Sequence, residues 1–295
     1  MVLVGPDQPI CANLDRCGCN WIADPGSAAG LCFNCGLTRT RPADGDLTGL
    51  AQYAVAESAK RRLVYELDGL GLPVTPSDGY VGLAFDLLSS SQVKITTGYE
   101  NGVITLDLAE SDDAHREALR ASMDEPYRTV LGHFRHEIGH YYCELLALTP
   151  ERRDRFHELF GDESTSYADA LQQHYAEGQG SDWQDTYISA YAAMHPLEDF
   201  AEVFAHFLHI SDTLQTAAEF GLLPDSSFGG DDDPLRRDFV EVVTGTWLPL
   251  TKGLNQINRS MGRQDLYPFV LAEPVLAKLG FVAELVSSAA GQARG

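Results

Sequence analysis

The chain has 295 residues, 44% hydrophobic and 22% charged, a composition that excludes a disordered, collagen-like or small disulfide-scaffold protein. Its 43 acidic and 21 basic residues give a formal charge of −22, which disfavours nucleic acid and anionic membranes as partners because both carry phosphates. Length predicts one or two domains.

Cysteine usage indicates a metal site in a reducing compartment. No run approaches the roughly 18 apolar residues of a membrane span, and the N-terminus has neither a basic start nor a long apolar run. We therefore expect a cytoplasmic protein, in which clustered cysteines bind metal more often than they pair. Only Cys143 lies outside the cluster formed by Cys11, Cys17, Cys19, Cys32 and Cys35.

The first half of the chain predicts a segment that needs a metal ion or disulfides for its stability, then a helix and a small sheet. Residues 1–45 are too poor in apolar residues to bury a core of their own. Apolar spacing predicts a helix over Leu47–Leu67. Short strands are predicted over Val81–Leu88 and Gln92–Thr97, and the alternating segment Val103–Leu108 follows Asn101-Gly102, which predicts a hairpin over Val93–Leu108.

The rest of the chain has helical periodicity. Helices are predicted over Asp112–Met123, Pro126–Leu148, Pro150–Leu159, Tyr167–Glu177, Asp182–Met194, Pro196–Ile210, Pro234–Met261 and Pro274–Val286. We predict an α+β fold, mostly helical with a small antiparallel sheet, divided into a domain over 1–45 and a second over 46–290.

One segment carries a metal-binding motif. His136-Glu137-Ile138-Gly139-His140 is an H-E-x-x-H sequence inside a predicted helix. Residues four apart share a helix face, so His136 and His140 can bind one Zn²⁺. Glu137 can then act as the general base towards the water that attacks a peptide carbonyl.

A catalytic zinc needs a third protein ligand. The metzincin pattern would place it at position 146, which is Leu146, so that class is excluded. Glu198 and Glu202 share a face of a later predicted helix. One of them can bind zinc while the other holds the far nitrogen of a ligand histidine.

H-E-x-x-H followed by the distant E-x-x-A-E of residues 198–202 resembles the gluzincin metallopeptidases, especially the lethal-factor type. In that type a tyrosine lies seven residues before the ligand glutamate, the place of Tyr191 here. The resemblance implies a zincin-like fold in which Glu198 is the third zinc ligand. It also implies that Glu202 hydrogen-bonds the far nitrogen of a ligand histidine and that Tyr191 donates a hydrogen bond to the oxyanion.

More of the chain resembles bacterial zinc-binding metallopeptidases with an N-terminal zinc ribbon. The matching stretches are LCFNCGLTRTRP, EPYRTVLGHFRHEIGHYY, FGDESTSYADALQQHYAEG and SAYAAMHPLEDFAEVFAHFLHISDTL. Gluzincins also resemble one another in binding extended peptides along a sheet edge, and Val103–Leu108 is the candidate for that edge.

The cysteine cluster predicts a structural zinc site. Cys32 and Cys35 form a C-x-x-C followed by Gly36, which is half of a tetrahedral site. Spacing leaves the other half open among Cys11, Cys17 and Cys19. The ribbon family's pattern implies Cys11 and Cys19, with Cys17 spare. Three arginines face four aspartates in this segment, so a protein partner or a structural role is favoured over nucleic acid.

The leading hypothesis is a zinc peptidase with one catalytic and one structural Zn²⁺, acting on a peptide or protein substrate. The alternative is a non-catalytic zinc-binding interaction or regulatory protein built on a metallopeptidase fold. Hydrolysis of a non-peptide amide by the same centre is a third possibility.

Overall fold

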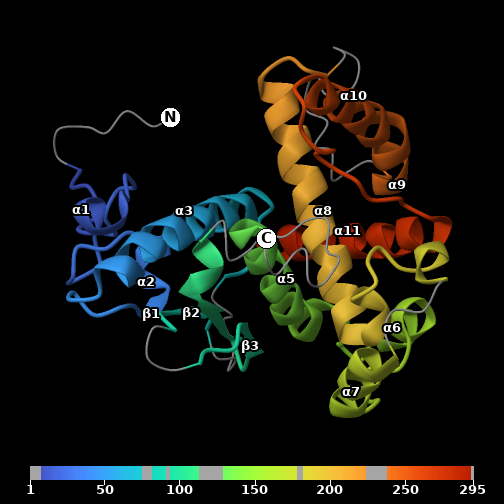
Figure 1. Ribbon diagram of the computed structural model, residues 1–295, viewed down its shortest axis with the longest axis horizontal. Coiled ribbons are helices and arrows are strands. Elements are labelled where there is room, and N and C mark those ends of the chain that lie inside the picture. Colours follow the sequence, from blue (N-terminus) through green and yellow to red (C-terminus); the bar gives the residue numbers. More distant parts are fainter. Residues whose placement is uncertain are drawn as a thin grey trace. The chain divides into compact units, whose positions relative to one another are not determined.

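The computed structural model describes residues 8–74, 82–90, 94–112, 129–177, 182–223 and 238–293 (Figure 1). The chain forms two compact units. The first comprises residues 1–69 and 73–137, and the second comprises 70–72 and 138–295. The boundary falls inside the continuous helix α5 (Val130–Tyr142), between Glu137 and Ile138.

The first unit combines the cysteine-rich segment, one long helix and a sheet. Its elements are α1 (Leu14–Cys17), α2 (Phe33–Gly36), β1 (Thr38–Thr40), α3 (Leu47–Gly69), β2 (Ala84–Leu88), β3 (Gly98–Glu100), β4 (Val103–Asp107) and the 3-10 helix η1 (Leu108–Ser111). Helix α3 confirms the prediction over Leu47–Leu67.

The four-stranded sheet has the order β1-β2-β4-β3, with β1–β2 and β2–β4 parallel and β3–β4 antiparallel. The hairpin is confirmed for β3 and β4: Asn101 and Gly102 have φ of 50° and 80°, as a type I′ turn requires. The predicted strand Gln92–Thr97 is not formed over 94–97, and 91–93 lie outside the described residues.

Two expectations about the sheet are wrong. The sheet is mixed rather than antiparallel, because β1 and β2 are joined through the long helix α3, a connection that allows parallel pairing. Val103–Leu108 does not supply an edge, because β4 pairs on one side with β2 and on the other with β3. Within the described part of the chain, the edge strands of this sheet are β1 and β3.

The second unit is helical and is organised around α8 (Pro196–Glu219), with α11 (Glu273–Ala293) packed against it (Figure 1). Phe200, Phe204 and Phe207 of α8 are fully buried. The other elements are the π-helical turns η2 (Cys143–Ala147) and η6 (Val243–Trp247), the 3-10 turns η3 (Trp183–Asp185) and η4 (Ala192–Met194), and the helices α6 (Arg153–Phe160), α7 (Tyr167–Glu177), α9 (Phe239–Val242) and α10 (Leu248–Ser260).

The predicted helices differ from the observed ones at particular places. The prediction over Tyr167–Glu177 is confirmed, whereas the helix over Asp182–Met194 is wrong, and only η3 and η4 form there. The carbonyl of Thr186 accepts a hydrogen bond from Lys278 Nζ at 3.0 Å, so it is bound to a distant side chain rather than to the next helical turn. The helix over Asp112–Met123 falls almost wholly outside the described residues.

Helix α11 departs from the expectation of no membrane-length apolar run. Its segment Glu273–Gly291 is long and apolar enough to cross a membrane by length and composition alone. Half of that segment is buried in the protein, including Val275, Leu279 and Val282. This burial is the pattern of a core helix.

Candidate metal centres

Helix α5 holds the H-E-x-x-H motif in a fixed orientation. The hydroxyl of Thr129 accepts a hydrogen bond from the Gly132 N–H at 2.9 Å, which caps the start of the helix. Phe134 and Ile138 are fully buried, so one face of the helix is committed to the interior. His136 and His140 lie one turn apart and are half-buried.

Helix α8 presents the second motif in its first turn. The His195 Nδ1 accepts the Leu197 N–H at 3.2 Å and caps the helix, and Pro196 occupies the first helical position. Glu198, two residues after that proline, is 3% exposed. The positive end of the helix dipole favours a carboxylate at this position.

A glycine lets the two helices meet. A Cβ built on Gly139 would lie 2.8 Å from Ala201 Cα and 3.0 Å from Ala201 O, distances that real Cβ atoms hardly show. Gly139 stands between the two histidines of the motif, and Ala201 lies one turn after Glu198. The absence of a side chain at residue 139 therefore allows the backbones of α5 and α8 to approach closely enough for their ligands to share one ion.

The imidazole and carboxylate groups fit a zinc ion. One ligand atom each of His136, His140 and Glu198 lies within 4.8 Å of the others. His140 Nε2 and Glu198 Oε1 are 3.5 Å apart. Two ligands bonded at about 2.0–2.1 Å in tetrahedral geometry stand roughly 3.3 Å apart, so these two atoms need little movement to bind zinc.

Gly139→Ala is expected to weaken zinc binding at this site and to destabilise the second unit. The new methyl must push the α8 backbone away, and overpacking of this kind costs typically ~1–3 kcal/mol. The checks are zinc affinity and urea unfolding. Gly253→Ala, on α10, is the matched control because a Cβ there meets nothing within 4 Å. Equal behaviour of the two variants would contradict the close-approach argument.

Sequence reasoning missed a tyrosine that contacts the carboxylate. Tyr167 Oη, at the start of α7, donates a hydrogen bond to Glu198 Oε1 at 2.9 Å. Tyr167 belongs to the stretch FGDESTSYADALQQHYAEG, which carried the family resemblance but received no role. Tyr191 is half-buried at the start of η4, and Glu202 is half-buried one turn after Glu198.

A buried ion pair fixes the same end of α8. Asp199 Oδ2 accepts from Lys278 Nζ of α11 at 2.6 Å, and both side chains are at most 3% exposed. The Lys278 ammonium also lies 4.4 Å from the Tyr187 ring centroid. Burial raises the pKa of Asp199 to about 7, even though the Lys278 charge opposes that rise.

The cysteine cluster forms a second candidate centre. One sulfur each of Cys11, Cys19, Cys32 and Cys35 lies within 4.8 Å of the others, and all four are buried free thiols. The N–H of Cys32 points to Cys11 Sγ at 3.3 Å, and that of Cys35 to Cys32 Sγ at 3.5 Å. Tetrahedral zinc with bonds of about 2.3 Å places sulfurs roughly 3.8 Å apart, which this cluster can satisfy.

Cys17 lies beside the cluster. Its sulfur groups with those of Cys35 and the Glu57 carboxylate, and Arg61 contacts it at 3.8 Å. Hydrogen bonds from the thiols of Cys17, Cys19 and Cys32 hold the pKa of Cys35 well below its ordinary value. A lowered pKa favours the thiolate, which is the form in which a cysteine binds metal.

The cysteine-rich segment is built into the first unit. Asn34, next to Cys35, donates to Glu57 Oε2 of α3 at 3.0 Å, and Lys60 Nζ donates to Glu57 Oε1 at 2.8 Å. Glu57 and Lys60 have fully buried side chains. Because β1 also pairs with β2, the segment is attached to both the helix and the sheet.

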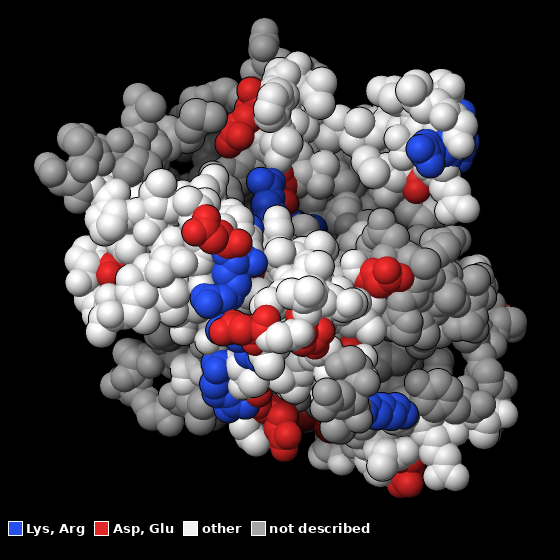
Figure 2. All heavy atoms as spheres, turned by 60° about the vertical axis from the view of Figure 1, so that its left-hand side comes forward, with Lys and Arg blue, Asp and Glu red and all other residues white. Residues whose placement is uncertain are grey.

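The arginines of this segment are paired with acids. Arg41 lies 2.8 Å and Arg16 3.9 Å from Asp44, and Arg39 forms a bidentate pair with Asp86. On the face drawn in Figure 2, basic side chains lie among acidic ones. Among the residues coloured there, Lys and Arg do not form a basic patch separate from Asp and Glu.

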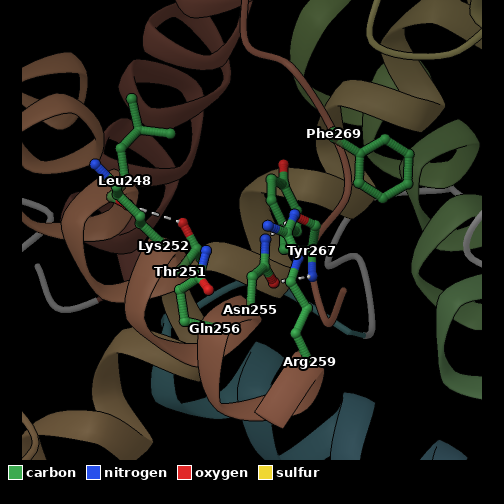
Figure 3. A pocket seen from close by; sticks show the side chains of 8 residues that line it. All are labelled: Leu248, Thr251, Lys252, Asn255, Gln256, Arg259, Tyr267 and Phe269. Carbon is green, nitrogen blue, oxygen red and sulfur yellow. Dashed lines mark hydrogen bonds between the residues drawn. The ribbon is translucent and has the colours of Figure 1, made fainter. Parts of the chain in front are cut away.

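A pocket of about 300 Å³ lies elsewhere in the second unit (Figure 3). It is lined by α10 and the segment around Tyr267 and Phe269. The Asn255 side chain donates to the Tyr267 carbonyl at 2.8 Å and accepts its N–H at 3.0 Å. None of the predicted site residues lines this pocket.

Comparison with known proteins identifies the family. A family described as "Putative zinc-binding metallo-peptidase" matches residues 49–285. The chain is 52% identical over 287 residues to the uncharacterized proteins Mb2598c of Mycobacterium bovis and Rv2568c of Mycobacterium tuberculosis, covering 96% of this chain and 84% of each relative. No solved structure matches significantly. Because this family model covers most of the chain, the chain belongs to this family of zinc-binding metallo-peptidases.

Proposed function

We propose that the protein is a zinc-dependent peptidase of the gluzincin type, acting on a peptide or protein substrate. The observation that carries this proposal is the convergence of His136, His140 and Glu198 beside Glu137. Three protein ligands would leave the fourth position of a tetrahedral zinc for water or substrate, as in a catalytic site and unlike a closed structural one. The presence of Glu137 favours the peptidase over a non-catalytic protein, because a site that only binds metal has no need of a base.

The chain's own residues have separate roles in the proposed reaction. His136, His140 and Glu198 hold the zinc, which when bound polarises the carbonyl and lowers the pKa of water towards ~7. Glu137 accepts the proton of the attacking water and returns it to the leaving amine. By resemblance to the lethal-factor type, Tyr191 donates a hydrogen bond to the carbonyl oxygen as charge develops there. Glu202 orients a ligand histidine through its far nitrogen.

We propose that Cys11, Cys19, Cys32 and Cys35 hold a second, structural zinc. Its binding free energy supplies stability that the small apolar content of residues 1–45 cannot supply. The burial of Glu57 and Lys60 under this segment supports a structural role. The paired arginines support a ribbon that does not bind nucleic acid, although its exposed surface remains available to a protein partner.

The test measures zinc and hydrolysis together. Elemental mass spectrometry of protein purified without added metal is expected to find two zinc ions per chain. His140→Ala should lose one zinc and all cleavage of a peptide library, whereas Cys32→Ser should lose the other zinc. Full cleavage by His140→Ala would contradict the proposed catalytic centre. So would a result in which Cys32→Ser loses zinc but His140→Ala keeps both ions.

A further inference from the structure

We propose that Tyr167 is a positioning residue, whose hydroxyl orients the Glu198 carboxylate for zinc. This inference rests on the proposed zinc site. It assigns a role to the first residue of α7, to which neither the motif spacing nor the family description gives one.

The contact is aimed at the ligand oxygen itself. Tyr167 Oη lies 2.9 Å from Glu198 Oε1, the same oxygen that stands 3.5 Å from His140 Nε2. A carboxylate oxygen has two lone pairs, so one can accept the phenol proton while the other faces the metal. The glutamate side chain has several rotatable bonds. A hydrogen-bond donor to its proposed ligand oxygen selects the rotamer that faces His140.

Tyr167 is tied to the beginning of the helix that carries Glu198. Its ring packs edge-on against the His195 ring, with centroids 5.3 Å apart. His195 Nδ1 accepts the Leu197 N–H, so that nitrogen carries no proton. His195 Nε2 then carries the proton and donates it to the Thr165 carbonyl at 3.2 Å, two residues before Tyr167.

These contacts link the start of α7 to the start of α8 at two places, through Glu198 and through His195. One histidine caps α8 and at the same time anchors the backbone that presents Tyr167 to the first turn of α8. His195 is 3% exposed, whereas Tyr167 is 40% exposed, so the anchor is buried while the tyrosine lies partly at the surface. Removing the phenol oxygen therefore changes the contact with Glu198 and little of the packing beneath it.

The experiment compares Tyr167→Phe with the wild type and with Tyr65→Phe, an exposed tyrosine of α3 in the other unit. Zinc affinity of the metal-stripped protein is measured by competition with a fluorescent chelator. Loss of a group that orients a metal ligand typically weakens binding ~10–100-fold. We expect this loss at one site of Tyr167→Phe, with the cysteine site serving as an unchanged internal reference.

A second readout separates positioning from a general structural defect. The zinc concentration that gives half-maximal peptide cleavage should rise for Tyr167→Phe by the same ~10–100-fold, with the maximum rate close to that of the wild type. Wild-type zinc affinity and zinc dependence in Tyr167→Phe would overturn the inference. A lowered maximum that zinc does not restore would also overturn it.

The outcome for the proposed function is read separately, from Glu198→Gln. If Glu198→Gln loses zinc while Tyr167→Phe does not, the peptidase proposal stands and the positioning role is wrong. If Glu198→Gln keeps its zinc affinity, the proposed site itself fails and the role of Tyr167 fails with it.

Discussion

Glu137→Gln is expected to lower peptide hydrolysis by about 10²–10⁴-fold, the contribution typical of a positioned general base. Glutamine has nearly the shape of glutamate but cannot accept the proton of the attacking water. Glu137 is 9% exposed and follows His136 directly on α5, and the proposed zinc has three other ligands. Both zinc ions should therefore remain bound, and the loss should fall on kcat.

The matched control for this variant is Glu144→Gln, which makes the same chemical change at an exposed position just after α5. It should leave cleavage and zinc content unchanged. Cleavage would be followed by mass spectrometry of a peptide library. Undiminished turnover in Glu137→Gln would remove this residue from the mechanism, and loss of zinc from that variant would make it a ligand instead of a base.

The local parts of the proposed site could be predicted from the sequence, and the distant parts could not. His136 and His140 share a face because of helical periodicity, which depends only on their spacing. That spacing could not select between Glu198 and Glu202, because the choice depends on how α5 and α8 pack. The absence of a side chain at Gly139, where a Cβ would lie 2.8 Å from Ala201 Cα, makes that packing possible. A single glycine within a helical pattern does not indicate such a close approach.

The sheet shows the same division. The Asn101-Gly102 turn fixes the β3–β4 hairpin through the φ preferences of two residues, so the sequence predicts it correctly. The parallel pairings of β2 with β1 and β4 depend on the path of the chain between the strands. Alternation of apolar residues in Val103–Leu108 indicates a strand with one buried face. It does not indicate whether that strand lies at an edge.

Tyr167 was missed for a comparable reason. Its contact with Glu198 spans 31 residues of sequence and depends on the anchor between His195 and Thr165. In the cysteine segment, C-x-x-C spacing identifies one half of the metal site. The choice of Cys11 and Cys19 over Cys17 depends on turns that spacing alone leaves open, and the fold brings the sulfurs of Cys11 and Cys19 together with those of Cys32 and Cys35.

Lys278→Met is expected to destabilise the second unit by about 4 kcal/mol, the middle of the range for breaking a buried ion pair by removing one partner. The variant keeps most of the side-chain volume but leaves Asp199 without its cation at 0% exposure. Burial already raises the pKa of Asp199 to about 7 with the lysine in place. The carboxylate must therefore stay charged without a partner or take up a proton, and either state is less favourable than the pair.

Urea unfolding followed by tryptophan fluorescence measures this loss, since Trp247 is buried in the second unit. With a slope of ~2 kcal/mol/M, the midpoint should fall by roughly 2 M. Adding Asp199→Asn to Lys278→Met removes the uncompensated charge and should recover much of the loss. Arg259→Gln, which breaks the exposed pair with Asp265, is the surface control and should change the midpoint little. If Lys278→Met behaves like that surface control, the buried pair does not hold α8 against α11.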